Sequence, residues 1–128
     1  MPITGHATTE GTSRYLERLR EAVAVNHFRL EQNLWLSSVG IGSYLGSPDA
    51  QTDASYTESV TRAVELGANV IDTAANYRFQ RSERAIGTAL RQMIESGDFA
   101  RDEIVVCTKG GYLPFDGRPP AGQEGVRR

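Results

Sequence analysis

An acid, a phenol and an amine stand at the ends of two successive apolar segments of this chain. Asp72 closes the first segment, Tyr77 follows five positions later, and Lys109 closes the second. A lysine ammonium beside a phenol favours loss of the phenol proton, and a carboxylate beside the lysine keeps that ammonium charged and oriented. Together the three side chains could protonate a carbonyl oxygen.

The same three residues also have simpler interpretations. Asp72 could cap the turn after its strand, since aspartate is common in turns. Tyr77 could be an aromatic residue at the rim of a domain, and Lys109 a solvated lysine before the Gly110-Gly111 turn. Their spacing alone does not decide between a catalytic and a structural role.

The elements that must position these residues alternate between strand and helix. In the first half of the chain the apolar pattern predicts a helix over 12–25 capped by Thr12 or Ser13, a hairpin over 28–36, and a short glycine-rich segment over 38–42. Ser55-x-x-Glu58 has the form of a capping box, so it predicts the start of the next helix, with Gly67 at its end.

The second half continues this alternation. A strand is expected over 68–73, a helix from about Ser82 to Gly97, and another strand over 103–108. Helical crossovers of this length join parallel strands, so the fold class is α/β. The continuous apolar character of 104–107 predicts a strand covered on both faces, with Cys107 as a buried, inert thiol.

Size and charge exclude several other classes of protein. The chain has 128 residues, enough for one domain, and its net charge of −2 provides no basic surface for nucleic acid or anionic membranes. It has no apolar stretch long enough to span a bilayer and no secretory-signal pattern. A single cysteine favours a reducing, cytoplasmic location. His6 and His27 have no metal-ligand spacing, so we expect ordinary surface histidines and no metal site.

Four segments, in order, resemble the aldo-keto reductase family. Residues 66–77 (LGANVIDTAANY) are similar to its signature, in which a strand ends in Asp-Thr-Ala and a tyrosine follows. Residues 82–90 resemble the next helix, 104–109 the next strand with Thr-Lys at its tip, and 28–43 the opening hairpin and first strand. The resemblance covers roughly residues 28 to 115.

This resemblance implies the N-terminal part of a (β/α)8 TIM barrel, about three βα units, preceded by a helix and a hairpin. The chain would divide into an extension (1–27), a partial barrel (28–116) and an irregular tail (117–128). The implied reaction is reduction of an aldehyde or ketone with NADPH, or alternatively NADH. Tyr77 would be the general acid, Lys109 would activate it and Asp72 would pair with Lys109. Gly42, Ser43, Tyr44 and Asp72 would border the cofactor.

Part of the family's site has no counterpart here. A barrel of this kind takes about 250 residues, and the family's catalytic histidine and phosphate-binding segments come later than Arg128. We therefore expect the isolated chain to be inactive as a reductase. The alternative is a non-catalytic binding or assembly module that self-associates through its incomplete barrel.

A basic cluster follows Tyr77. Arg78, Arg81 and Arg84 could meet a phosphate or an acidic substrate, but a solvated loop and helix start is the favoured interpretation.

Overall fold

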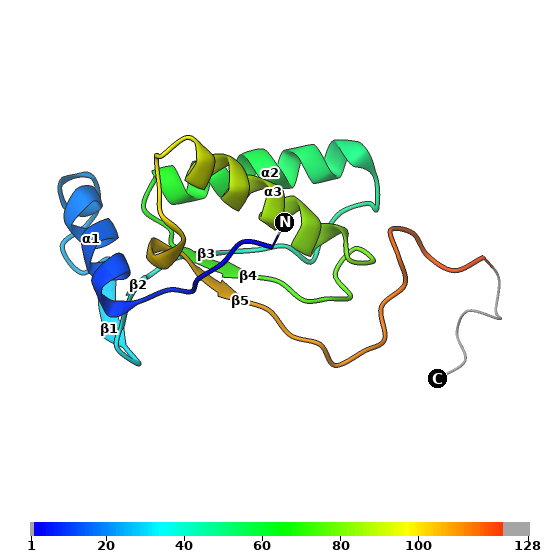
Figure 1. The fold of residues 1–128 in the computed structure, drawn as a ribbon, viewed down its shortest axis with the longest axis horizontal. Coiled ribbons are helices and arrows are strands. Elements are labelled where there is room, and N and C mark those ends of the chain that lie inside the picture. Colours follow the sequence, from blue (N-terminus) through cyan, green and yellow to red (C-terminus); the bar gives the residue numbers. More distant parts are fainter. Residues whose placement is uncertain (1, 122–128) are drawn as a thin grey trace.

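A computed structural model describes residues 2–121 of the chain. Residues 122–128, most of the predicted irregular tail, lie outside the described residues. The elements run in the order α1 (Thr9–Leu19), η1 (Arg20–Ala22), β1 (Phe28–Glu31), β2 (Leu34–Ser37), β3 (Gly40–Gly42), α2 (Ala50–Glu65), β4 (Val70–Asp72), α3 (Arg81–Glu95), η2 (Arg101–Glu103) and β5 (Val105–Cys107) (Figure 1).

The chain forms one small parallel sheet and one separate hairpin. The sheet has the order β3-β4-β5, and both of its strand pairs are parallel. The predicted α/β class and the alternation of strands with crossover helices are therefore confirmed. Within the described residues the sheet stays open at both edges, so closure into a (β/α)8 barrel remains a prediction.

The predicted hairpin is also confirmed, with a physical reason in its turn. β1 pairs with β2 in antiparallel fashion across a two-residue connection. Gln32 and Asn33 both adopt positive φ, 49° and 62°. Two left-handed residues in succession match the right-handed twist of the flanking strands, as short hairpin turns require.

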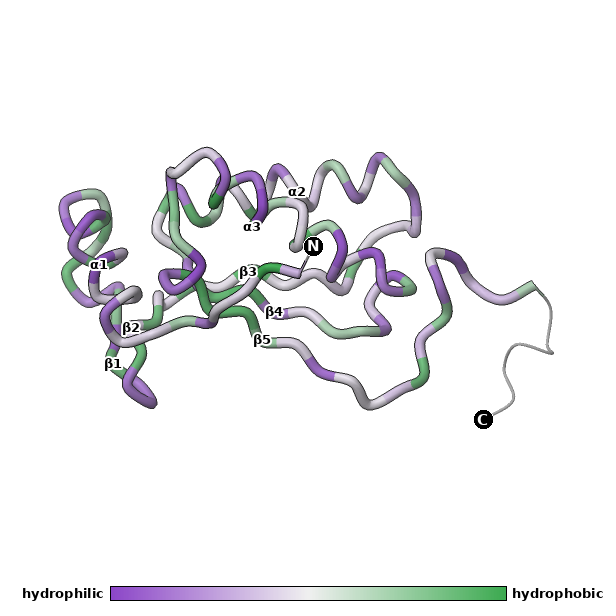
Figure 2. The backbone as a smooth tube through the Cα atoms, viewed as in Figure 1, coloured by the Kyte–Doolittle hydropathy of each residue, from purple (hydrophilic) through white to green (hydrophobic). Residues whose placement is uncertain are grey.

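Helices α2 and α3 lie side by side against one face of the parallel sheet (Figure 1). The core between them includes Val60, Val64, Ile71 and Ile104, each 0% exposed. In Figure 2, where the backbone is coloured by hydropathy, hydrophobic residues accordingly cluster in β3, β4 and β5.

The helices cover only one face of the parallel sheet, and this corrects two expectations about β5. Val105 and Val106 are half-buried, so the strand is not covered on both faces among residues 2–121. Cys107 is exposed, so the prediction that its thiol is buried was wrong. An apolar run shows that a strand can be buried, but only neighbouring elements decide whether it is.

Two predicted helix starts were wrong. α1 begins after Thr8, whose hydroxyl accepts a hydrogen bond from the amide of Gly11 (2.9 Å), rather than at Thr12 or Ser13. α2 begins after Asp49, whose carboxylate caps the Thr52 amide (2.8 Å), six residues before the proposed capping box. Both true caps have extended backbone dihedrals, which place the side-chain oxygen over the first free amides.

The end of α2 follows the prediction. Gly67 has φ 110°, a left-handed conformation that glycine adopts without a steric penalty. The carbonyl of Gly67 lies 2.7 Å from Nε2 of His27, and Nδ1 of that ring lies 2.9 Å from the Ser38 hydroxyl. His27 is thus a half-buried structural residue and not an ordinary surface histidine, whereas His6 is exposed.

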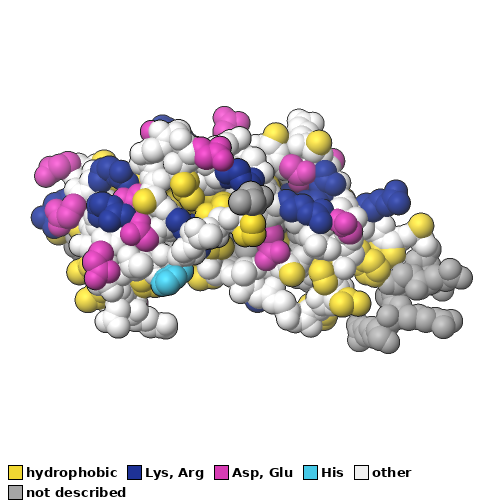
Figure 3. Space-filling view, viewed as in Figure 1, with side chains coloured by type: hydrophobic (Ala, Val, Ile, Leu, Met, Phe, Trp, Pro, Cys, Tyr) yellow, Lys and Arg dark blue, Asp and Glu magenta, His cyan; other side chains and the backbone are white. Residues whose placement is uncertain are grey.

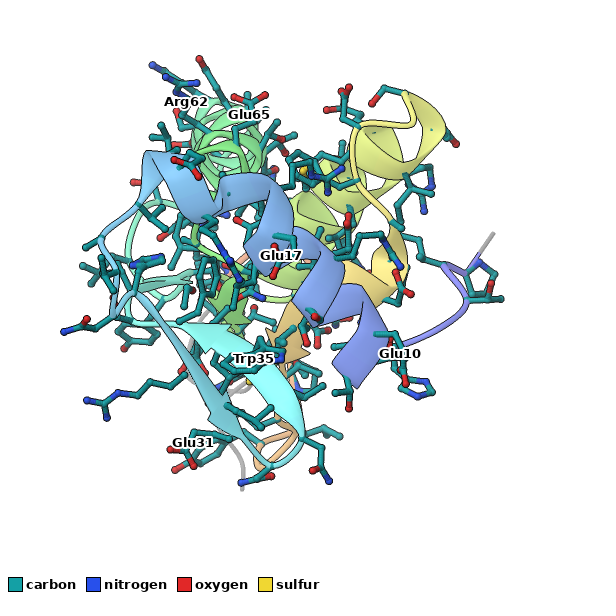
Figure 4. All side chains as sticks on the ribbon, turned by 90° about the vertical axis from the view of Figure 1, so that its left-hand side faces the viewer. Glu10, Glu17, Glu31, Trp35, Arg62 and Glu65 are labelled. Carbon is teal, nitrogen blue, oxygen red and sulfur yellow. The ribbon has the colours of Figure 1, made fainter. Side chains whose placement is uncertain are left out.

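Helix α1 and the hairpin lie at the amino ends of the parallel strands, opposite the loops that carry the predicted site (Figure 1). In Figure 4, α1 runs across the hairpin, with Glu17 on the helix and Trp35 on the strand beneath it. Tyr15 of α1 is fully buried, and its hydroxyl donates to the carbonyl of Val64 in α2 (2.5 Å). This burial raises the pKa of Tyr15.

Charged side chains of both signs are interspersed on the face of the molecule shown in Figure 3. In the part of the chain that the structure describes, no helix has the length and apolar character needed to traverse a bilayer.

Candidate active site

The carboxyl ends of the three parallel strands meet at one edge of the sheet. Gly42, Asp72 and Cys107 are aligned in register, so the loops that follow them start at the same level. Past the strands, the Thr73 amide donates to the carbonyl of Cys107 (2.8 Å) and the Ala75 amide donates to that of Lys109 (2.9 Å). These bonds extend the pairing of β4 with β5 as far as Lys109.

Lys109 is held by Asp72 at this edge. Its Nζ donates to both carboxylate oxygens of Asp72, at 2.9 and 3.1 Å, and to the carbonyl of Thr73 at 2.8 Å. Both side chains of the ion pair are 53% exposed. The hydrogen bond to Asp72 and, next, the contact with Tyr77 raise the pKa of Lys109. Lys109 is therefore a cation at neutral pH, with a defined orientation.

Tyr77 completes the arrangement. The ammonium of Lys109 lies 4.8 Å from the centroid of the Tyr77 ring. Tyr44 packs against the same ring edge to face, with centroids 5.1 Å apart and planes at 70°. Tyr77 is half-buried, so its ring is supported while part of it stays accessible. The structure thus brings Asp72, Tyr77 and Lys109 together, as their spacing suggested.

The loop after β3 places the other predicted residues at the same edge, in different environments. A methyl group built on Gly42 would meet no atom within 4 Å, and the Tyr44 side chain is 66% exposed. Ser43 is 1% exposed, and its hydroxyl donates to the carbonyl of Asp72 (3.0 Å). Gly42 and Tyr44 face open space, whereas the Ser43 side chain binds the loop to β4.

Several residues that support this edge were not singled out from the sequence. The Ser82 hydroxyl donates to the carbonyl of Ser43 (2.5 Å), and the Thr108 hydroxyl donates to Glu83 (2.5 Å). Thr73 is 1% exposed, and its hydroxyl has no hydrogen-bond partner among the described residues. Serine and threonine are too common for such roles to be recognised without knowing which loops are neighbours.

Arg78 and Arg81 form ion pairs that are largely covered, which corrects the prediction of a solvated cluster for these two residues, whereas Arg84 is exposed as predicted. Arg78 is only 5% exposed, and it pairs with Asp53 of α2 (2.7 Å). Arg81 binds the other oxygen of the same carboxylate (2.7 Å), and Arg84 pairs with Asp116 (2.7 Å). Although burial alone would raise it, the pKa of Asp53 is lowered by hydrogen bonds from Arg81 and Arg78.

A groove of about 730 Å³ lies elsewhere, between the outer surfaces of α2 and α3. Its lining combines threonines with Glu58, Glu65 and Arg62 of the α2 surface, and it contains none of Asp72, Tyr77 and Lys109. The candidate active site is therefore the edge of the sheet, where the acid–base trio lies, rather than this groove. Residues 2–121 also contain no group of three or more His, Cys, Asp or Glu side chains that could hold a metal ion.

Comparisons with known proteins find reductases that are similar to this chain. Aldose reductase C of Dictyostelium discoideum is 26% identical over 84 residues, covering 66% of this chain and 24% of the relative. The NADH-specific methylglyoxal reductase of Escherichia coli (strain K12) is 31% identical over 86 residues, covering 63% of this chain and 24% of the relative. The chain therefore spans about a quarter of the length of these curated relatives. No solved structure was found to match it.

The family assignment rests on the segment that carries the trio. Residues 38–128, more than half of the chain, match the family described as "Aldo/keto reductase family". This segment includes the parallel sheet, both crossover helices and all three side chains of the predicted acid–base site. The chain belongs to the aldo/keto reductase family.

Proposed function

We propose that Asp72, Tyr77 and Lys109 form the proton-donating part of a site that reduces an aldehyde or ketone with a nicotinamide cofactor. The observation that carries this proposal is the position of Lys109, held by the Asp72 carboxylate with its ammonium 4.8 Å from the Tyr77 ring. An ammonium that contacts both a carboxylate and a phenol ring at the carboxyl edge of a parallel sheet is suited to acid–base catalysis.

The proton follows a short path in this proposal. The Tyr77 O–H donates its proton to the carbonyl oxygen of the substrate, which leaves a phenolate on the ring. The Lys109 ammonium stabilises that negative charge because it is already at the ring, and Asp72 keeps the ammonium charged and oriented. When bound, the dihydronicotinamide supplies the hydride that adds to the carbonyl carbon.

The residues at this edge of the sheet could border one side of the flat nicotinamide ring. Gly42 leaves free space beside Asp72, and the exposed ring of Tyr44 stands edge to face against the ring of Tyr77. We propose that Gly42, Tyr44 and Asp72 border the cofactor, while Ser43 acts by holding the loop through Asp72. NADPH is the proposed cofactor and NADH the alternative, since one relative is a NADH-specific reductase.

The proposed setting is a cytoplasmic protein acting on a small carbonyl compound. The chain spans 24% of each relative, and the resemblance to the family implies a catalytic histidine and phosphate-binding segments later in the barrel. We therefore expect the 128-residue chain by itself to show no measurable reduction of an aldehyde with either cofactor.

A chimera tests the roles of the residues. Residues 38–115 of this chain would replace the matching segment of the E. coli relative, and NADH-dependent reduction of methylglyoxal would be measured. We expect an active chimera in which Tyr77→Phe lowers kcat at least ~100-fold, the contribution of a positioned general acid. Tyr112→Phe is the matched control, because Tyr112 is 77% exposed, and it should leave kcat unchanged.

Two results would contradict the proposal. One is a Tyr77→Phe chimera that retains the activity of its parent. The other is an inactive chimera whose circular dichroism and thermal transition match those of the intact relative, since a folded site with these three residues should then work. Reduction by the isolated chain that disappears with Tyr77→Phe would support the site but overturn the expected inactivity.

A further inference from the structure

The backbone directly after Tyr77 makes an unusual turn. Arg78, Phe79 and Gln80 all have positive φ, 49°, 56° and 72°, and none of them is glycine. Side chains other than glycine disfavour this left-handed region, and three such residues in succession are rarer still. Other contacts must hold the turn in place, and the turn directly follows the residue that carries the Tyr77 ring.

The side chain of Arg78 makes several contacts of this kind, beside a hydrogen bond from the Gly117 amide to the carbonyl of Phe79 (2.7 Å). Its Nε and Nη2 donate to the carbonyl of Ser47 at 3.1 and 2.8 Å, and Nη2 also donates to Asp53 at 2.7 Å. The guanidinium lies over the Tyr56 ring, 5.0 Å from its centroid. Since Arg78 is 5% exposed, these bonds are largely shielded from water, unlike those of a surface ion pair.

One nitrogen of the Arg78 side chain takes no part in these contacts. Its Nη1 is buried and has no hydrogen-bond partner among the described residues. A buried, unsatisfied N–H group is unfavourable, and an apolar side chain would avoid it. What the arginine provides is a directional link between two loops.

Those two loops carry the two facing tyrosines. Ser47 belongs to the loop after β3, three residues beyond Tyr44, and Arg78 directly follows Tyr77 in the loop after β4. The Tyr44 and Tyr77 rings meet edge to face, 5.1 Å apart. A bond between Arg78 and the Ser47 carbonyl therefore joins the loops next to the ring contact.

We infer that Arg78 is a positioning residue: by tying the left-handed turn to the Ser47 loop and to Asp53, it holds the Tyr77 ring against Tyr44 and beneath the Lys109 ammonium. The inference rests on the proposed function, in which Tyr77 is the proton donor. Arg78 itself touches none of the reacting atoms in this scheme.

Lys109 makes a direct test possible, because it is the only lysine in the chain. In the 128-residue protein labelled with 13C-lysine, a single set of side-chain NMR signals reports on it. Since the ammonium lies over the Tyr77 ring, its ε-methylene protons should resonate upfield. Tyr77→Leu removes the ring, so its Lys109 chemical shift defines the value expected when the upfield displacement is lost completely.

Arg78→Asn is the test variant, since asparagine tolerates left-handed backbone but cannot bridge to Ser47. We expect its Lys109 signal to move most of the way to the Tyr77→Leu value. Arg84→Gln, which removes an exposed arginine paired with Asp116, should keep the wild-type value. Fluorescence of the single tryptophan, Trp35, checks that each variant is folded.

If Arg78→Asn does not fold, Asp53→Asn takes its place and should shift the signal part of the way, because the bonds to Ser47 remain. The inference is overturned if a folded Arg78→Asn keeps the wild-type signal, if Asp53→Asn is unchanged when Arg78→Asn cannot fold, or if wild type equals Tyr77→Leu. None of these readouts involves catalysis, so they are independent of the reductase proposal.

Discussion

At the scale of single residues, the site depends on a lysine that is exposed yet well oriented. Water screens such pairs, so the contact of Lys109 with Asp72 should contribute little to folding. Its effect is local: three acceptor contacts keep the ammonium at one place beside the Tyr77 ring. Orientation, rather than burial, is what this edge of the sheet provides.

Asp72→Asn should lower the pKa of Lys109, because the hydrogen bond to Asp72 is the largest cause of its raised value. A raised lysine pKa means that the interaction is fully present below the ordinary pKa and is lost as the pH rises through the raised value. At neutral pH the wild-type pair should therefore be intact. NMR titration of the single lysine measures this directly.

Glu83→Gln is the control for this titration, since Glu83 accepts a hydrogen bond from Thr108 and none from Lys109. Its lysine should titrate as in wild type. Equal titration of Asp72→Asn and wild type would show that the carboxylate does not act on Lys109 in solution.

At the scale of elements, α1 packs closely on the amino end of the domain. Asn69, 0% exposed, joins the hairpin to the sheet: its Oδ1 accepts from the Ser37 amide (3.0 Å) and its Nδ2 donates to the carbonyl of Trp35 (2.9 Å). α1 then packs against η2, where Arg14 and Arg18 bind the buried Glu103. Residues 1–27 are thus integrated with the elements that follow them.

Two helical glycines should respond in opposite directions to the same substitution. A methyl group on Gly11 of α1 would lie 2.2 Å from the backbone oxygen of Asp102, so Gly11→Ala should destabilise the fold by about 1–3 kcal/mol. On Gly87 of α3 it would meet nothing within 4 Å, so Gly87→Ala should stabilise by about 0.5–1 kcal/mol.

Urea denaturation followed through Trp35 fluorescence measures both changes. A neutral or stabilising Gly11→Ala would show that α1 does not pack on η2 as closely as described. Gly87→Ala serves as the control, since it makes the same chemical change in open space.

At the scale of the whole molecule, the open sheet is the dominant feature. Both edges of β3-β4-β5 are unpaired within the described residues, and hydrophobic side chains lie beyond the carboxyl ends of the strands (Figure 3). Leu45 and Leu113 are 75% and 95% exposed there. Exposed strand edges and apolar side chains favour association with another chain.

We predict that the purified 128-residue chain self-associates, so that it elutes from gel filtration as a species larger than its 14.0 kDa monomer. Replacing Leu45 and Leu113 with serine should shift the population toward monomer. Val25→Ser is the matched control, because Val25 is fully exposed but lies in the amino-terminal region. A monomer at all accessible concentrations would contradict this proposal.

The order of elements and the proximity of Asp72, Tyr77 and Lys109 could be predicted from the sequence. Apolar periodicity depends only on local geometry, so the crossover helices, the strands around Ile71 and Val106, and the stop at Gly67 were predictable. Asp72 and Lys109 follow strands, and parallel strands end at a common edge. That geometry made their meeting with Tyr77 predictable as well.

Tertiary structure alone decided what surrounds those residues. Thr8 and Asp49, rather than Thr12 and Ser55, cap their helices, with extended backbone dihedrals and side chains that accept from the first free amides. Arg78 reads as a solvated loop residue, yet it is buried against the loop after β3. Cys107 reads as buried, yet it is exposed. Burial and partner choice depend on residues distant in sequence, which local patterns cannot encode.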